Sequence, residues 1–326
     1  MTGGAGFIGS HLVDALLQQG HEVTVLDNFS TGRRENLFHV SQDINLIECD
    51  LGVDGKWSSE FQGVDWVFHL AALADIVPSI QQPQAYFRAN VDGTFNVVQA
   101  ARMGGATRFV YVASSSSYGL PNIFPTPESA DIDPQYPYAL TKYLGETLIM
   151  HWGKVYELPV LSLRFFNVYG PRSRTSGTYG AVFGVFLAQK LANVPYTVVG
   201  DGSQTRDFTY VTDVVQALIA AVQSSRSGAV YNVGSGATIS VNRLVELLGG
   251  EKVFIPKRPG EPDCTFADIS KIQAELGWHP EVTIERGVSR LLEHIEYWRD
   301  APVWTPDSIA TATQDWFRYL GSSDSG

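Results

Sequence analysis

The opening nine residues constrain the fold of this chain more than any other stretch, because every third one is glycine. Gly3, Gly6 and Gly9 form the pattern Gly-x-x-Gly-x-x-Gly. An amphipathic helix that can stop at Gly20 is expected next, and an apolar strand follows it and ends in Asp27. A glycine turn, a helix, a strand and an acid in this order are typical of a parallel α/β sheet.

These residues suit a dinucleotide. Glycine has no Cβ and tolerates positive φ, so the backbone here can approach a pyrophosphate closely. Asp27 lies about 20 positions past the glycines, where an acidic residue can bind ribose hydroxyls. Its charge would repel a 2′-phosphate, which favours NAD over NADP, although Arg33 and Arg34 are close enough in sequence to accommodate a phosphate. We predict an NAD site.

The start of the chain departs from this pattern. The glycine turn of such a sheet follows a strand, whereas here the sequence begins inside the turn. That strand is the central one, and without it buried backbone groups would lack partners. We expect either about 4–8 further apolar residues ahead of Thr2 in the native protein or another segment in the same slot.

Composition narrows the class of protein. A hydrophobic content of 44% with 17% charged residues is that of a globular protein. The net charge of -11 argues against nucleic acid as a partner. No apolar run reaches the roughly 18 residues that span a bilayer, and Cys49 and Cys264 have neither metal-site spacing nor disulfide density. We predict a cytoplasmic protein with no metal site and no membrane contact.

Strands and helices alternate along the first half. Strands are expected at 22–26, 44–49, 65–70, 108–113 and 158–163, and helices at about 86–103 and 138–156. This alternation predicts an α/β fold, a doubly wound parallel sheet of Rossmann type with a smaller α/β substrate lobe. We expect the NAD-binding domain at 1–166 plus about 207–249, and the nucleotide-sugar lobe at about 167–206 plus 250–326.

A catalytic set is expected at the edge of this sheet. Tyr138 and Lys142 are four residues apart on one helical face, and a nearby ammonium, like an oxidised nicotinamide, favours the phenolate of a tyrosine. Ser114 ends a buried strand, and ligands bind outside the carboxyl ends of parallel strands. Ser114, Tyr138 and Lys142 together predict acid–base chemistry beside the dinucleotide.

With these motifs, nearly the whole chain resembles the extended short-chain dehydrogenases/reductases, in the branch of NAD-dependent nucleotide-sugar epimerases and dehydratases that includes UDP-glucose and UDP-N-acetylglucosamine 4-epimerases. The matching motifs are residues 2–9, 27–28, 50–51, 69–72, Asn90, Ser114, Tyr138 with Lys142, 164–171, 200–208, 231–236 and 258–261.

The resemblance implies roles for individual residues. Those implied to bind the cofactor are Gly3, Gly6, Phe7, Ile8, Gly9, Asp27, Asn28, Asp50, Leu51, Leu70, Ala71, Ala72, Asn90, Tyr138 and Lys142. Those implied to bind the sugar nucleotide are Ala74, Ser115, Ser116, Asn167, Arg206 and Arg258. The two arginines would hold the diphosphate, because guanidinium groups donate bidentate, charged hydrogen bonds to phosphate.

Ser115 and Ser116 indicate the reaction. The related dehydratases carry Asp and Glu at these positions, and the decarboxylases carry Glu at that of Ser116. A serine alone does not perform carboxylate acid–base work at neutral pH. We therefore predict a 4-epimerase that oxidises C4 of a UDP-sugar transiently with tightly bound NAD.

The sugar is left open. Ala74 stands where restricted epimerases have lysine, so the site has room for UDP-N-acetylhexosamines besides UDP-glucose and UDP-galactose. The hydroxyls and arginines of 172–178 could instead hold the carboxylate of UDP-glucuronate. A 4,6-dehydratase or reductase and a non-catalytic NAD-binding regulator are weaker alternatives.

Three further features concern the oligomeric state, the loop residue Asp75 and the C-terminal segment. The resemblance implies a homodimer, to which Leu144, Leu148, Ile149 and Trp152 could contribute a helical face. Asp75 replaces a more usual small residue, with an unassigned effect. The segment 302–320 is a C-terminal addition with aromatic residues that pack on the body, and it also has no assigned function.

Overall fold

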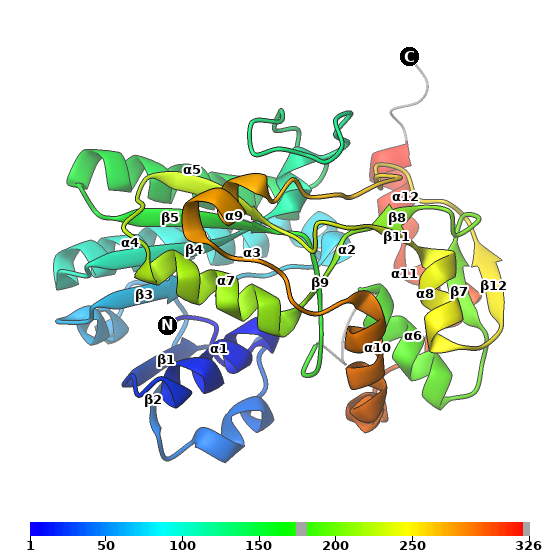
Figure 1. Cartoon of the computed structure of the whole chain (residues 1–326), viewed down its shortest axis with the longest axis horizontal. Helices are drawn as coiled ribbons and strands as arrows, with labels where there is room; N and C mark the ends of the chain where they lie inside the picture. The colour runs from blue at the N-terminus through cyan, green and yellow to red at the C-terminus, as the bar shows by residue number, and fades with distance from the viewer. Residues whose placement is uncertain (174–180, 322–326) are drawn as a thin grey trace.

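The structure, a computed structural model, describes residues 1–173 and 181–321 (Figure 1). Its centre is a parallel sheet, which confirms the predicted doubly wound α/β class. The strands in spatial order are β2 (Ile44–Glu48), β1 (Val23–Asp27), β3 (Trp66–His69), β4 (Arg108–Ser114), β5 (Val160–Phe165) and β10 (Ala229–Val233). Every residue of β5 is buried, because helices cover both faces of a parallel sheet.

The first two residues occupy the slot between β1 and β3. Thr2 bridges Leu26 and His69 in parallel register. Its N–H donates to the Phe68 carbonyl at 3.0 Å, and the Leu26 N–H donates to the Met1 carbonyl at 2.9 Å. The carboxyl end of the central slot is therefore paired by Met1 and Thr2 themselves. In the described ranges, no other strand lies between β1 and β3.

Two layers of helices enclose the sheet (Figure 1). One face carries α4 (Gly93–Gly104) and α5 (Pro137–Tyr156), which pack on each other and on β3, β4 and β5. The other face carries α1 (Phe7–Gln18) and α7 (Val211–Gln223). The expected helix 86–103 is divided into α3 (Pro83–Phe87), a π turn and α4. Each layer has its own apolar core.

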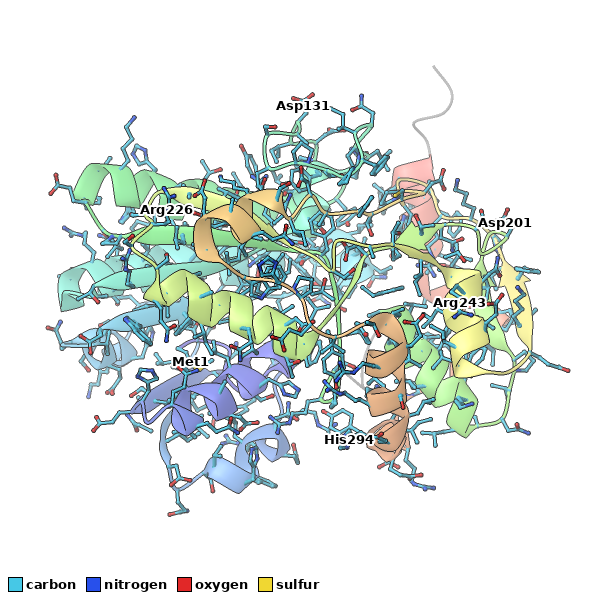
Figure 2. All side chains as sticks on the ribbon, in the orientation of Figure 1. Met1, Asp131, Asp201, Arg226, Arg243 and His294 are labelled. Atoms are coloured by element: carbon cyan, nitrogen blue, oxygen red, sulfur yellow. The ribbon has the colours of Figure 1, made fainter. Side chains whose placement is uncertain are left out.

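The second lobe has a separate core around Phe186 and Trp298. Its elements are α6 (Val182–Leu191), β7 (Tyr196–Val199), α8 (Val241–Leu248), β12 (Lys252–Ile255), α10 (Ile284–Glu293), α11 (Pro306–Ala312) and α12 (Gln314–Leu320). Figure 2 labels Asp201 and Arg243 in this lobe, well away from Met1 in the first. Short pairs join the lobes, namely β6 (Asn167–Tyr169) with β9 (Phe208–Tyr210) and β8 (Thr205–Arg206) with β11 (Ile239–Ser240).

Two segments depart from the expected division. Helix α8 was expected in the NAD-binding domain, but its apolar residues, Leu244 among them, pack in the core of the second lobe. Helix α9 (Ser270–Leu276) was expected in the second lobe, but Ile272 and Trp278 pack with the first. An amphipathic helix shows which of its faces is buried and not which core buries it, so the sequence could not decide these two cases.

Candidate active site

A cavity of about 700 Å³ lies between the two lobes, a size that suits a bound cofactor and substrate. The carboxyl ends of β1, β3, β4 and β5 open into it. Of the predicted site residues, all except one line this cavity: Gly3, Gly6, Phe7, Ile8, Gly9, Asp27, Asn28, Asp50, Leu51, Leu70, Ala71, Ala72, Ala74, Ser114, Ser115, Ser116, Tyr138, Lys142, Asn167, Arg206 and Arg258.

The glycine turn can hold only glycine at two of its positions. Gly3 has φ +73°, and a Cβ there would lie 2.6 Å from the Ala71 nitrogen. A Cβ on Gly9 would lie 2.1 Å from the Gly3 carbonyl oxygen. Helix α1 starts directly after Gly6, which has no side chain to cap it. The positive end of α1 therefore faces the cavity, where it suits the pyrophosphate of a dinucleotide.

The Asp27 carboxylate both supports this turn and lines the cavity. It accepts the Ala5 N–H at 2.9 Å and the Phe29 N–H at 2.8 Å. Burial raises the pKa of Asp27, and these backbone donors oppose the rise. Arg33 lines the cavity, whereas Arg34 pairs with Glu48 outside it. The turn, the helix end and the acid together fit NAD.

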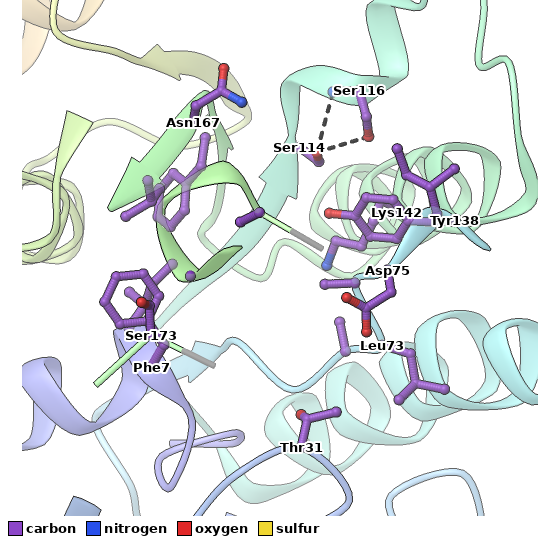
Figure 3. Close-up of a pocket in the computed structure, with 18 of the residues that line it drawn as sticks. Phe7, Thr31, Leu73, Asp75, Ser114, Ser116, Tyr138, Lys142, Asn167 and Ser173 are labelled. Atoms are coloured by element: carbon purple, nitrogen blue, oxygen red, sulfur yellow. Dashed lines mark hydrogen bonds between the residues drawn. The ribbon is translucent and has the colours of Figure 1, made fainter. Parts of the chain in front are cut away.

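The structure brings Ser114, Tyr138 and Lys142 together from two elements (Figure 3). Ser114 ends β4, and its Oγ lies 2.8 Å from the Ser116 Oγ and accepts the Ser116 N–H at 3.2 Å. Helix α5 begins at Pro137, so Tyr138 is in its first turn and Lys142 one turn later. Proline is favoured at that first position because it has no N–H to leave unpaired.

Burial dominates the electrostatics of this cluster. It raises the pKa of Tyr138; hydrogen bonds from Ser114 and Ser116 lower it, and the charge of Asp75 raises it further. Burial also lowers the pKa of Lys142 to about 7, partly opposed by Glu146. The sequence led us to expect an ammonium that favours the Tyr138 phenolate. In the protein alone, burial therefore acts against both the ammonium of Lys142 and the phenolate of Tyr138.

Asn90 corrects one expectation. It does not line the cavity and is 1% exposed. Its amide holds the backbone of Leu73 with two bonds, accepting the N–H at 2.8 Å and donating to the carbonyl at 3.0 Å, and it also donates to the Thr141 Oγ1 at 2.9 Å. Asn90 thus fixes the loop that carries Ala74 and Asp75 against helix α5. A motif position alone does not show whether an amide faces a ligand or the loop behind it.

The second lobe contributes a cationic wall to the cavity. Arg206 Nη2 lies 2.8 Å from Glu261 Oε1, and Arg258 Nη1 lies 3.5 Å from Glu261 Oε2. Both arginine side chains are about nine-tenths buried. Asp207 does not pair with Arg206; it accepts hydrogen bonds from Ser235 and from the Ala267 N–H. One glutamate therefore holds two guanidinium groups at the cavity, where an anionic ligand would be bound.

Several cavity residues were not predicted. Tyr136 stacks on Tyr138 with the ring centroids 6.3 Å apart and the planes 10° apart. Others that line the cavity are Phe183, Gln204, Thr265, Trp304 and Trp316. Asp75 precedes helix α2 (Ile76–Gln81), but its carboxylate does not cap that helix. It lies just below Tyr138 and Lys142 in Figure 3, and its charge acts on Tyr138. Phe183 and Trp316 lie on helices α6 and α12, and the others lie on loops or directly before helices. Contacts between distant segments bring them to the cavity, so the sequence offered no local signal for them.

Residues 1–234 match the NAD dependent epimerase/dehydratase family. The chain belongs to this family. Its fold is the one this family shares, and its cofactor is NAD, as predicted. When bound, NAD supplies an acceptor and donor of hydride for the substrate.

Relatives within the family are similar over most of their length. The UDP-glucose 4-epimerase of Mycolicibacterium smegmatis is 36% identical over 90% of this chain and 96% of its own. The UDP-glucuronic acid decarboxylase 1 of Arabidopsis thaliana is 35% identical over 90% of this chain and 68% of its own. Epimerases and decarboxylases are thus similarly distant in sequence.

Solved structures of two epimerases in the family are similar to this chain over nearly their whole length. The UDP-glucose 4-epimerase of Thermotoga maritima, solved with UDP-glucose, has a TM-score of 0.85 at 33% identity and covers 92% of this chain and 97% of its own. The UDP-glucuronic acid 4-epimerase of Bacillus cereus, solved with UDP-glucuronic acid and NAD, has a TM-score of 0.84 at 32% identity and covers 90% and 98%.

Within 1–173 and 181–321, no group of three His, Cys, Asp or Glu side chains could hold a metal ion. Among the helices described, none is both long and apolar enough to cross a membrane.

Proposed function

We propose that this family member is a UDP-sugar 4-epimerase that inverts C4 of UDP-glucose and UDP-galactose. The observation that carries the proposal is the hydroxyl run Ser114, Ser115 and Ser116 beside the half-buried Tyr138. This run provides hydrogen bonds to a sugar oxygen and no carboxylate for losing water or carbon dioxide from the oxidised sugar.

Tyr138, Ser114 and Lys142 have different roles in one proton transfer at the sugar 4-hydroxyl. Tyr138 takes the proton of the sugar 4-hydroxyl while hydride leaves C4, and it returns the proton when hydride comes back. Ser114 hydrogen-bonds the same oxygen and orients it. Lys142, buried one turn behind Tyr138, supplies positive charge that stabilises the phenolate. The pKa of Tyr138, raised by burial, must fall for this step, and the positive charge of the oxidised cofactor acts in that direction.

Inversion requires that the sugar turn while its nucleotide stays fixed. Arg206 and Arg258 would hold the diphosphate from the second lobe, in competition with Glu261. The 4-keto sugar then presents its opposite face to the returning hydride, with no net redox change. NAD stays bound throughout, so turnover needs no added cofactor.

Ala74 supports a roomy sugar site. It lines the cavity and is exposed, and its methyl group leaves space that a lysine would fill. We therefore expect N-acetylhexosamine forms to be accepted besides UDP-glucose.

A second candidate is UDP-glucuronate 4-epimerisation, which the Bacillus cereus relative performs according to its name. Arg172 and Ser173 line the cavity, but Arg172 Nη1 donates to Asp14 Oδ2 at 2.8 Å. The remaining residues of that loop, 174–178, lie outside the described ranges. Dehydration, decarboxylation and a non-catalytic role are weaker candidates, because the serine run lacks an acid and the catalytic set is intact.

The test is a coupled assay across UDP-glucose, UDP-N-acetylglucosamine and UDP-glucuronate, without added NAD. We expect interconversion of UDP-glucose and UDP-galactose, and release of NAD when the protein is denatured. Tyr138→Phe should lower kcat by about 10²–10⁴-fold. Tyr143→Phe, on the same helix, is the matched control and should retain activity. Near wild-type turnover by Tyr138→Phe would show that the base is assigned wrongly.

We also propose a homodimer formed by the outer faces of α4 and α5. Ile149 packs on the sheet and is fully buried, so it is not available for this contact. Large apolar side chains are exposed on these helices instead: Phe95, Met103, Leu140, Val155 and Tyr156. Light scattering of the purified protein, with Met103→Glu as a disrupting variant, tests the dimer. The cytoplasmic location stays a prediction.

A further inference from the structure

The last helix, α12, turns one large side chain into the protein. Trp316 is 4% exposed, whereas Phe317 and Tyr319 on the same helix are 39% and 56% exposed. Trp316 also lines the cavity between the lobes. Among the residues of α12, Trp316 is the one that reaches the binding site.

Trp316 fixes the arginine of the cationic wall in two ways. Its ring centroid lies 5.3 Å from the guanidinium carbon of Arg258, a distance at which a cation and an aromatic face attract. Its indole N–H donates to the carbonyl of Pro259, the next residue, at 2.7 Å. Side chain and backbone of the Arg258 loop are thus held by one indole. Arg258 itself is about nine-tenths buried beside Glu261.

The neighbouring residue on α12 contacts the other lobe. Asp315 Oδ2 accepts a hydrogen bond from Gln81 Nε2 at 2.9 Å. Gln81 ends α2, and α12 packs along that helix. Helix α2 starts directly after Ala74 and Asp75, which line the cavity from the NAD-binding side. Gln81 itself lies outside the cavity, but Ile76 at the start of the same helix lines it. Two consecutive residues of α12 therefore contact two elements, the Arg258 loop and helix α2, that contribute to the cavity from different lobes.

We propose that α12 is a clamp across the cavity and that Trp316 is the positioning residue for Arg258. In this role Trp316 touches neither the sugar nor NAD. It orients the guanidinium group that would bind the nucleotide diphosphate. The proposal rests on the proposed function in one respect only, namely that the ligand carries a uridine diphosphate. It holds whichever UDP-sugar is the substrate.

The decisive measurement is calorimetric binding of UDP to the purified protein with its NAD. Trp316→Ala should raise the Kd for UDP roughly tenfold, because Arg258 loses its aromatic support. The KM for the UDP-sugar should rise in parallel, with kcat within about twofold, since uniform binding is lost and the chemical step is not. NAD content should not change. A purely structural role would reduce kcat, NAD content and thermal stability together.

Three variants sharpen the comparison. Trp316→Phe keeps an aromatic face and loses the N–H, so UDP binding should weaken about threefold. Phe317→Ala, one residue along and exposed, is the matched control and should leave the Kd unchanged. In Arg258→Ala, adding Trp316→Ala should cause no further loss, because the tryptophan acts through the arginine.

The outcomes separate the two claims. Unchanged UDP binding in Trp316→Ala, or a full additional loss in the Arg258→Ala background, would overturn the clamp and leave the proposed function standing. A wild-type protein that binds no UDP would contradict the proposed function, and the clamp with it. If Trp316→Ala fails to fold, Trp316→Phe alone and combined with Arg258→Ala decides by the same criteria.

Discussion

The negative charge of Asp75 acts on the proposed catalytic base. Burial is the main reason why the pKa of Tyr138 is raised, and the Asp75 carboxylate adds to the rise. A phenol whose pKa is raised is a poor base at neutral pH until positive charge lowers that pKa. Asp75 therefore sets part of the pH range in which Tyr138 can work.

We expect Asp75→Asn to move the acid limb of kcat/KM to lower pH. The rate rises with pH as Tyr138 loses its proton, and removal of a nearby negative charge lowers the pKa for that loss. A pH profile of the purified variant measures the shift. Asp54→Asn, at an exposed site, is the control. An acid limb at the wild-type position would show that the Asp75 charge does not reach the base.

The sequence predicted individual chemical groups better than their surroundings. Tyr138 and Lys142 share a helical face by their spacing alone, and Ser114 ends an apolar strand, so topology brings the three together. The role of Asn90 could not be predicted, because an amide side chain can hydrogen-bond either a bound cofactor or the backbone of the loop behind it. The raised pKa of Tyr138 depends on burial by segments that are distant in the sequence, which no local pattern encodes.

At the scale of elements, one buried ion pair joins helix α5 to strand β5. Arg164 Nε donates to Glu146 Oε2 at 3.0 Å, and the two side chains are 6% and 5% exposed. Ser162 Oγ donates to the same carboxylate at 2.8 Å, and Arg164 Nη1 donates to the Tyr118 Oη at 2.8 Å. This network fixes the helix that carries Tyr138 and Lys142 against the sheet.

Glu146→Gln should lower the free energy of unfolding by about 3–5 kcal/mol, because it leaves the Arg164 charge buried without a counter-ion. Urea denaturation measures the loss. Glu296→Gln breaks the exposed pair with Arg299, whose side chains are 63% and 67% exposed, and should cost at most about 1 kcal/mol. Equal losses in the two variants would contradict this ranking of the pairs.

Helix α1 packs so closely on the glycine turn that a methyl group at Gly9 should disturb both stability and NAD binding. Gly9→Ala puts a methyl group against the Gly3 carbonyl, so we expect a loss of about 1–3 kcal/mol in stability together with lower NAD content. Gly93→Ala is the control: φ there is −58° and the nearest atom lies 3.7 Å from the new Cβ. That variant should retain NAD and gain up to about 1 kcal/mol.

At the scale of the whole molecule, a buried histidine joins the first residues to the sheet. His69 lies 2.7 Å from Thr2 Oγ1 and 2.9 Å from Thr94 Oγ1. Thr94 Oγ1 donates to the Asn90 carbonyl, so it accepts from His69 Nε2, and the Thr2 hydroxyl donates to Nδ1. The imidazole is therefore neutral, and burial lowers its pKa to about 3.

This histidine should make folding sensitive to acid. Its pKa is about 6.5 in the unfolded chain and about 3 in the fold, so the stabilisation is complete above pH 6.5 and is lost as pH falls towards 3. Between pH 7 and pH 5 the loss amounts to about 2 kcal/mol. Urea unfolding at both values measures it. His69→Asn should remove this part of the pH dependence, and His279→Asn, at an exposed site, should leave it unchanged.

The fold class was predictable because strand and helix alternate with buried strands throughout the first half. The division between lobes was not predictable. Helix α8 packs in the core of the second lobe, and α9, which follows it in the chain, packs with the first. Contacts between distant segments decide such cases. The same holds for helix α12. Its aromatic residues predict that it packs on the protein, but not that Trp316 contacts Arg258.

Asp27 has a consequence for anyone who wishes to change the cofactor preference of this protein. A common design for accepting NADP replaces the acid at the end of this strand, here β1, with a small or neutral residue. Here the same carboxylate receives the Ala5 and Phe29 N–H groups and thereby shapes the turn itself. Redesign must therefore rebuild the turn as well as the charge, and selectivity and foldability in this chain cannot be altered separately.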